Sequence, residues 1–185
     1  MSNEIFRSSR IKLCAPRAED AKEVCVWHED AYYLRNVDTE PAYPISEEKA
    51  EKEIKGGSGD FYFHLRTLDD DRLIGFATLH SIEWNNQLAN LAIGIGNQND
   101  RGKGFGGEAL KLIMRYAFME LNLFRLSLEV IAYNTNAVNL YLRSGFIKEG
   151  VIREAVYRDN QRHDRIAMGI LRTDWLKENV SGITY

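Results

Sequence analysis

Alternating hydrophobic and polar residues in the middle of the chain predict a run of neighbouring β-strands. Residues 61–68 and 73–84 have the pattern of two strands joined by an acidic turn, and Asn85-Asn86 leads into a third strand over residues 87–96. From Gly104 to Leu121 the apolar residues recur at helical spacing instead. The remaining predicted elements are a strand at 11–13, helices at 17–30 and from Ser46, a strand at 124–132, a helix at 136–144, and strands at 146–157 and 162–172.

The order of these elements is β-α-α-β-β-β-α-β-α-β-β. Antiparallel hairpins interspersed with helices indicate an α+β fold, in which helices flank a mixed, mostly antiparallel central sheet. A length of 185 residues predicts a single domain over residues 1–185. The 44% hydrophobic and 28% charged residues are ordinary for a globular protein.

Several other classes of protein are disfavoured by the composition. No apolar run has the length of a membrane helix or the character of a signal peptide, so we expect no membrane association. The net charge of −3 argues against nucleic-acid binding. Cys14 and Cys25 lack metal-ligand spacing, so we expect no metal. Two isolated thiols also suggest a reducing compartment, which makes the cytoplasm the expected location.

Charge is distributed unevenly along the chain. Residues 18–60 hold 12 acidic and 5 basic side chains, whereas residues 101–125 hold 5 basic and 2 acidic ones. These segments could form one wall for a cationic acceptor and another for an anionic cofactor. Solvated helix faces explain the acidic segment equally well.

A glycine-rich segment lies between the strand at 87–96 and the helix that follows it, and reads Arg101-Gly102-Lys103-Gly104-Phe105-Gly106-Gly107-Glu108. Glycines at such a junction let backbone N–H groups and the positive end of the helix approach an anion, above all a phosphate. The segment is not a P-loop, because Gly107 is followed by Glu108 and not by Lys-Ser or Lys-Thr. A dinucleotide site fits poorly, because Glu120, the only acidic residue near the required distance, lies within the predicted helix.

A second motif follows downstream, where a strand ends at Asn134, a short helix carries Tyr141, and Gly145-Phe146 ends that helix. Together with Arg101-x-x-Gly104-x-Gly106, it resembles the two signatures of the GNAT superfamily of N-acetyltransferases. The resemblance covers roughly Ile11 to Trp175. It implies a GNAT fold whose central sheet is splayed, so that the pantetheine of acetyl-CoA fills the gap as a pseudo-strand.

The resemblance also implies roles for particular residues toward acetyl-CoA. The backbone of Ile93, Gly94 and Ile95 would hold pantetheine and polarise the thioester carbonyl. Asn134 and Asn136 would bind pantetheine, with helix capping as an equal alternative. The pyrophosphate would be held by the backbone N–H groups of the loop and by the charges of its two basic residues; the loop residues concerned are Arg101, Gly102, Lys103, Gly104, Phe105, Gly106 and Gly107.

Tyr141 occupies the position of the family's general acid for the CoA thiolate. A tyrosine with a pKa near 10 would donate its proton to a thiolate with a pKa near 8.5 at a cost of roughly 2 kcal/mol. The residue would therefore need a lowered pKa, or it would act chiefly as a hydrogen-bond donor.

The general base is less well defined by the sequence. Asn90 stands where relatives in the RimJ/RimL group often have glutamate, and an asparagine cannot accept the amine's proton. His80 and Glu83 on the preceding strand are the substitutes, either directly or through water; a structural role for a lone strand histidine is the alternative.

The C-terminal residues 150–171 resemble the final hairpin of the RimJ/RimL group and of spermidine N-acetyltransferases. The leading hypothesis is therefore an N-acetyltransferase that uses acetyl-CoA and acts on a primary amine, either a protein N-terminus or a polyamine. The acidic segment, with Glu29, Asp30, Asp38 and Glu40, modestly favours a cationic acceptor. A non-catalytic protein that binds acyl-CoA is the alternative from another class, and the family resemblance suggests a homodimer.

Overall fold

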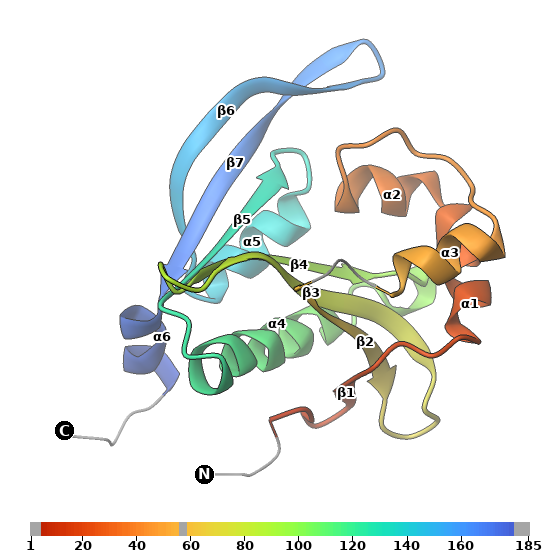
Figure 1. The fold of residues 1–185 in the computed structure, drawn as a ribbon. Helices are drawn as coiled ribbons and strands as arrows, with labels where there is room; N and C mark the ends of the chain where they lie inside the picture. Colours follow the sequence, from red (N-terminus) through yellow and green to blue (C-terminus); the bar gives the residue numbers. More distant parts are fainter. Residues whose placement is uncertain (1–4, 56–58, 180–185) are drawn as a thin grey trace.

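The computed structural model describes residues 5–55 and 59–179 and has seven strands in one sheet, in the order β1-β2-β3-β4-β5-β7-β6 (Figure 1). Most neighbouring strands are antiparallel, which confirms the predicted α+β class with a mixed sheet. The elements are β1 (Ile11–Cys14), α1 (Asp20–His28), α2 (Ala31–Val37), α3 (Glu47–Glu53), β2 (Phe61–Thr67), β3 (Leu73–Glu83), β4 (Leu88–Ile95), α4 (Phe105–Arg115), β5 (Arg125–Ile131), α5 (Thr135–Arg143), β6 (Ile147–Arg158), β7 (Gln161–Leu171) and α6 (Arg172–Asn179).

Among the described strands one neighbouring pair is parallel, β4 and β5, and the sheet divides there. Pairing between these strands runs from Leu88 opposite Arg125 to Asn90 opposite Ser127 and then stops, although both strands continue. Beyond Asn90, β4 remains paired with β3 on its other side. The predicted splay is therefore present, and we call the gap between residues 91–95 and 128–131 the slot.

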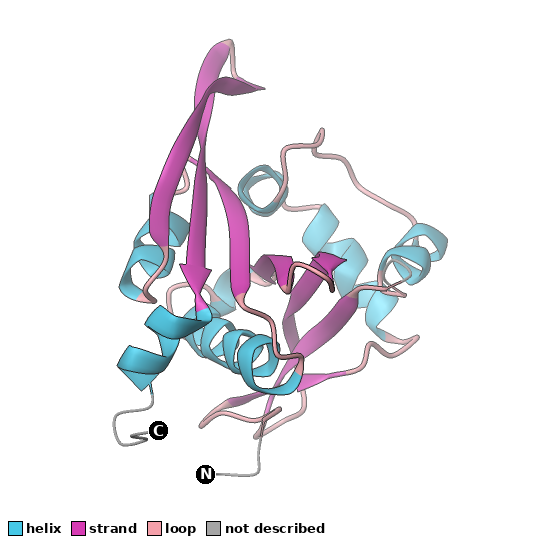
Figure 2. Ribbon diagram, turned by 60° about the vertical axis from the view of Figure 1, so that its left-hand side comes forward, coloured by secondary structure: helices cyan, strands magenta, loops and turns pink. Residues whose placement is uncertain are grey.

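Helices cover the sheet on both sides (Figure 2). The buried side chains of α4, among them Leu110 and Ile113, belong to the larger hydrophobic core together with residues from most strands. A second core joins α1, α2 and α3, where Val24, Trp27 and Leu34 pack together. Each helix contributes one apolar face because its hydrophobic residues recur at helical spacing. The slot therefore lies in a sheet that is supported from both faces.

The N-terminal helical region differs from its prediction. The helix expected over residues 17–30 is present as the shorter α1, and it is followed by α2, which was not predicted. The carboxylate of Asp30 accepts a hydrogen bond from Tyr33 N at 3.1 Å and starts α2. Ala21 and Val24 are buried as expected, whereas Cys25 is only half-buried. Ser46 caps α3 as predicted and accepts from Lys49 N at 3.3 Å.

Two further differences concern helix ends. The helix predicted to reach Leu121 ends as an α-helix at Arg115 and continues as one π-helical stretch over Tyr116–Glu120. Tyr116 packs there against Phe61 and Phe63, with ring centroids 5.6 and 5.2 Å away. The C-terminal α6 was not predicted. Its mostly polar residues form no continuous apolar stripe, and Trp175 anchors it on Phe118 at 5.4 Å.

Candidate active site

The slot exposes backbone hydrogen-bonding groups of β4. Gln87 O accepts from Phe124 N and Arg125 N of the β5 side, so alternate residues from Gln87 onward direct their backbone groups toward β5. By this alternation the backbone groups of Ile93 and Ile95 face the slot. An extended molecule with amide groups fits such an edge, because it can complete the interrupted ladder.

Gly94 has another role in the same strand. Gly96 N donates to Ile74 O of β3 at 3.0 Å, so Gly94, two residues earlier, also directs its backbone groups toward β3 and away from the slot. A Cβ atom at Gly94 would lie 2.5 Å from Cε1 of Phe76 and 3.0 Å from the hydroxyl of Tyr33. The glycine therefore makes room for the Phe76 ring beside the slot.

The glycine loop forms a left-handed turn into α4. Gly102 and Gly104 have φ angles of +74° and +88°, which glycine adopts without strain, and Gly104 is the N-cap of the helix. Its carbonyl accepts from Gly107 N and Glu108 N, which leaves the amides of Phe105 and Gly106 at the open first turn. This arrangement suits an anion, as the sequence predicted.

One cavity of about 470 Å³, which we call the loop cavity, collects the predicted cofactor residues. Every residue predicted to bind acetyl-CoA lines it except Lys103, and Tyr141 lines it as well. Asn136, which the sequence analysis treated as a pantetheine ligand or a cap, is exposed there on the first turn of α5. Predicted cofactor residues between positions 93 and 136, together with Tyr141, therefore line the same cavity.

Arg101 is held by the protein itself. Its Nε donates to Ile95 O at 3.1 Å, it forms an ion pair of 2.7 Å with Asp30, and its guanidinium lies 5.3 Å from the ring centre of Tyr33. A second nitrogen donates to Gly96 O. The guanidinium thus connects the end of β4 to the start of α2. A phosphate at the loop would therefore be bound mainly by groups other than Arg101.

Two residues in or beside the loop cavity were missed by sequence reasoning. Asp30 was noted only as part of an acidic segment, yet it both caps α2 and pairs with Arg101. Arg143 lines the cavity from the last turn of α5, two residues after Tyr141. Its position next to the second motif was the available signal for an additional anion-binding residue.

Glu108, which ends the glycine loop, does not oppose an anion. Its carboxylate accepts from Ser8 Oγ at 2.7 Å and pairs with Arg10 at 2.5 Å. Burial alone would raise the pKa of Glu108, but the hydrogen bonds from Ser8 and Arg10 outweigh it and hold the pKa below its ordinary value. The negative charge of Glu108 is therefore bound by Ser8 and Arg10 in the segment before β1.

Tyr141 is 7% exposed and lies between two cavities. Burial raises the pKa of Tyr141 to about 12. A lowered pKa, one of the two options that the sequence left open, is therefore not supported. The hydroxyl remains protonated at neutral pH and serves as a hydrogen-bond donor.

A second cavity of about 530 Å³, the His80 cavity, opens on the other side of Tyr141. His80 and Asn90, which are partners across β3 and β4, both line it. Glu83 does not, because the pairing shifts after His80 and its carboxylate accepts from Asn86 Nδ2 at 2.5 Å in the following turn. Of the two proposed bases, only His80 is thus placed in a cavity with Tyr141.

Segments distant in the sequence enclose the His80 cavity. Asn134 donates from Nδ2 to Asn36 O at 3.1 Å, while its Oδ1 caps α5 by accepting from Ala137 N. Both polar atoms of this predicted pantetheine ligand are thus engaged. Arg158, at the end of β6, donates to Thr39 O at 2.8 Å and to Glu40 O at 2.9 Å.

The part of the chain that the structure describes has no group of three or more His, Cys, Asp or Glu side chains arranged to hold a metal ion. Within the same ranges, no helix combines the length and apolar character needed to cross a bilayer.

Comparison with known proteins gives consistent results. Residues 10–147 match the family model of the acetyltransferase (GNAT) domain. The N-acetyltransferase p20 of Bacillus licheniformis is 26% identical over 143 residues, which cover 74% of this chain and 79% of p20. YdaF of Bacillus subtilis, named as a candidate ribosomal N-acetyltransferase, is 30% identical over 108 residues, 58% of each chain.

Among solved structures, the spermidine N-acetyltransferase of Vibrio cholerae in complex with CoA and spermine is similar, with a TM-score of 0.82 and 25% identity. The alignment covers 91% of this chain and 99% of that one. The splayed sheet, the glycine loop at the start of α4 and the matching family model lead to one conclusion: this chain belongs to the GNAT family of acetyltransferases, which use acetyl-CoA as their cosubstrate.

Proposed function

We propose that the protein transfers the acetyl group of acetyl-CoA to a primary amine by direct attack of the amine on the thioester. The observation that carries this proposal is the meeting of the loop cavity and the His80 cavity at shared walls, formed by Ile93, Asn134 and Tyr141. A cosubstrate held along β4 and an amine in the His80 cavity would approach the same point from two sides.

In this proposal, different residues bind the cosubstrate and accept the proton of the amine. Backbone groups of Ile93 and Ile95 hold the pantetheine and polarise the thioester, and the amides at the start of α4 hold the pyrophosphate. Arg101 keeps that loop attached to α2, and Arg143 supplies exposed positive charge. His80 takes the amine's proton, directly or through a water molecule, because Asn90 beside it has no basic group.

Tyr141 donates a hydrogen bond to the departing sulfur. With a pKa of about 12 against about 8.5 for a thiol, full proton transfer from this hydroxyl would cost about 5 kcal/mol. A hydrogen bond stabilises the developing thiolate without that cost. Water then supplies the proton to the released thiolate.

The acceptor is a protein N-terminal amine or a small amine, and a polyamine of the spermidine type is the alternative. The similar Vibrio cholerae structure supports the polyamine, since it holds spermine. The acidic wall is weaker here than the sequence suggested. Asp30 pairs with Arg101 at 2.7 Å, and Asp38 accepts from the backbone N–H groups of Thr39 and Glu40. The polyamine therefore stays the alternative acceptor.

We further propose that residues 1–185 act as one catalytic domain, in the cytoplasm and as a homodimer. The two free cysteines, Cys14 and Cys25, support a reducing compartment. The family model and the similar structure both extend across most of the chain, which supports one domain.

The proposal is tested by measuring thiol release from acetyl-CoA with a panel of N-terminal peptides, spermidine and simple alkylamines. We expect at least one amine to release CoA in a saturable manner and to be recovered with one added acetyl group. If acetyl-CoA binds, for example by calorimetry, but no amine in the panel releases thiol, the non-catalytic acyl-CoA-binding protein is the better description.

A further inference from the structure

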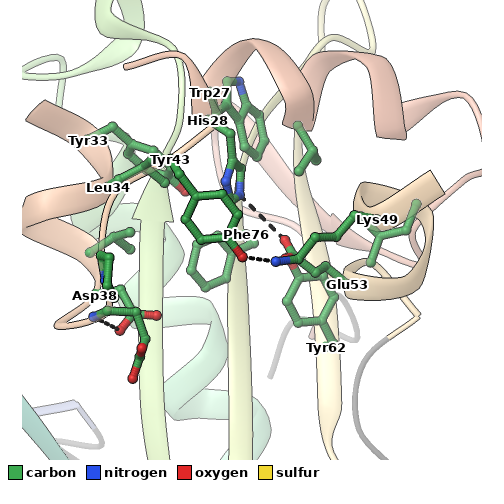
Figure 3. A pocket seen from close by; sticks show the side chains of 15 residues that line it. Trp27, His28, Tyr33, Leu34, Asp38, Tyr43, Lys49, Glu53, Tyr62 and Phe76 are labelled. Atoms are coloured by element: carbon green, nitrogen blue, oxygen red, sulfur yellow. Dashed lines mark hydrogen bonds and ion pairs between the residues drawn. The ribbon is translucent and has the colours of Figure 1, made fainter. Parts of the chain in front are cut away.

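A third cavity, of about 420 Å³, lies between α1, α2, α3 and the strands β2 and β3 (Figure 3). We call it the aromatic cavity. Tyr62 and Phe76 stack with ring centroids 5.6 Å apart and planes 10° from parallel. Trp27 and Tyr33 meet edge to face at 6.2 Å. These four rings line the cavity, and an aromatic lining of this kind favours a further aromatic ring.

Three ionisable side chains around the aromatic cavity pair with one another, and the carboxylates of Asp38 and Glu40 line it as well. Lys49 donates to the hydroxyl of Tyr43 and lies 3.8 Å from Glu53, and Glu53 lies 3.4 Å from Nε2 of His28 (Figure 3). Burial lowers the pKa of His28, although the Glu53 charge opposes this shift, so the ring is neutral at pH 7. Lys49 and Glu53 are thus engaged with each other, and the aromatic rings beside them favour an uncharged, planar group.

The aromatic cavity adjoins the His80 cavity. Val37 and Asp38, at the end of α2, line both of them. Phe76 and His80 are four residues apart on β3 and therefore point to the same face of the sheet. At about 3.3 Å per residue their Cα atoms are separated by about 13 Å along the strand. A molecule with its amine beside His80 can thus place a distant ring over Phe76.

We infer that the aromatic cavity is the acceptor's second subsite and that the preferred acceptor is a primary amine carrying an aromatic ring on a long spacer. This inference rests on the proposed acetyl transfer. The ring stacks on Tyr62 and Phe76, the spacer passes Val37, and the amine reaches His80 and Tyr141. An N-terminal peptide with an aromatic side chain beyond its first residue has this layout.

The inference is tested with phenethylamine, phenylbutylamine and phenylhexylamine, each compared with the alkylamine of the same chain length. We expect kcat/KM for phenylhexylamine to exceed that for hexylamine by about tenfold, the gain typical of one buried aromatic contact. The advantage should shrink toward phenethylamine, because its short spacer cannot bridge the two cavities. Thiol release and the acetylated product are both measured.

Two variants and a control locate the effect. Tyr62→Ala and Phe76→Leu each remove one stacked ring and should reduce the ratio of the two kcat/KM values to about one. Trp84→Ala removes an exposed ring at the far end of β3 and should keep the ratio. Thermal unfolding confirms that each variant is folded. If one of the two variants does not fold, the other still tests the subsite.

The possible results separate the two proposals. Equal kcat/KM values for the phenyl and alkyl series, with acetyl transfer intact, would overturn the aromatic subsite and leave the acetyltransferase function standing. A preference for the phenyl series that survives in both Tyr62→Ala and Phe76→Leu would also overturn it. If no amine of any kind releases thiol, the proposed function fails and the subsite fails with it.

Discussion

At the scale of single residues, Tyr141 shows how burial limits chemistry. Its side chain is almost fully buried, and burial makes the anionic form of the hydroxyl costly. A buried tyrosine of this kind can still donate a strong hydrogen bond to a nearby anion. In the proposed mechanism, the same burial that makes full proton transfer costly would strengthen the hydrogen bond from Tyr141 to the thiolate.

We therefore expect Tyr141→Phe to lower kcat by about 10- to 100-fold, the value of one hydrogen bond to a charged group. The Kd for CoA should change by less than about twofold, because the ring still packs in place. Steady-state kinetics and calorimetry give both numbers. Tyr157→Phe, at an exposed position of β6, is the matched control. An unaltered kcat would remove Tyr141 from the mechanism.

His64 makes stability depend on pH. The ring is fully buried, and its Nδ1 lies 2.6 Å from the carboxylate of Asp20, which also binds Arg66. Burial lowers the pKa of His64 even though Asp20 opposes the shift. The unfolded chain, with a histidine pKa near 6.5, then binds more protons than the folded one as the pH falls below that value.

The free energy of unfolding should consequently decrease as the pH falls from 7.5 to 5, by no more than about 2 kcal/mol from His64. Urea unfolding at both pH values measures this. His64→Gln should reduce the dependence and leave the part that comes from His28, whose pKa burial also lowers. His163→Gln, where the ring packs on Tyr133, is the control variant. A wild-type stability that rises toward pH 5 would contradict this assignment.

At the scale of elements, α2 is the common wall of all three cavities. Tyr33 faces the loop cavity and the aromatic cavity, and Val37 lines all three. The helix has only seven residues, and contacts at its two ends hold it in place. Asp30 attaches its start to Arg101, while Tyr133 donates to Arg35 O near its end.

Asp30→Ala should raise the KM for acetyl-CoA by about tenfold, because it removes both the cap of α2 and the partner of Arg101, together worth about 1–2 kcal/mol. Asp159→Ala removes the other ion pair of the helix, with Arg35, and should leave that KM unchanged. Kinetics at saturating amine distinguish the variants. Equal KM values for Asp30→Ala and the wild-type protein would show that Arg101 keeps its place without Asp30.

Elements whose formation depends on residues close together in the sequence could be predicted. The hairpin of β3 and β4 and the caps at Ser46 and Asn134 depend on neighbouring residues, and the sequence predicted them. The helix α2 was not predicted, because its seven residues are too few to show a clear helical pattern in the sequence.

For the candidate site too, the parts formed by contiguous residues were predicted and the long-range contacts were not. The glycine loop and Tyr141 were found from motifs, since each motif is contiguous in the chain. The pair of Arg101 with Asp30 joins residues 71 positions apart, and no local pattern reveals it. Glu83 was expected beside His80, but the register shift after His80 turns the strand and carries Glu83 out of the cavity.

At the scale of the whole molecule, the hairpin of β6 and β7 reaches from the far end of the sheet toward the N-terminal helices (Figure 1). Arg158 in this hairpin holds the carbonyls of Thr39 and Glu40, and Asp159 pairs with Arg35. Segments more than 100 positions apart thereby enclose the His80 cavity.

Arg158→Ala should raise the KM for the amine by about three- to tenfold, since two hydrogen bonds to the segment after α2 are lost. The KM for acetyl-CoA should stay within about twofold. Arg162→Ala, in the same hairpin on the ring of Tyr157, is the control. Parallel changes in both KM values would indicate a general loss of structure instead.

The interrupted pairing of β4 and β5 has a consequence for how the protein is kept folded. Only three residue pairs join the two halves of the sheet along this seam, so an extended ligand lying in the slot would act as the missing strand. Ligand at a hundred times its Kd would then add about 2.7 kcal/mol to the free energy of unfolding. Backbone amides on both sides of the seam would exchange hydrogen more slowly. The cell's supply of activated acetyl groups would thus help to set the lifetime of the enzyme that consumes them.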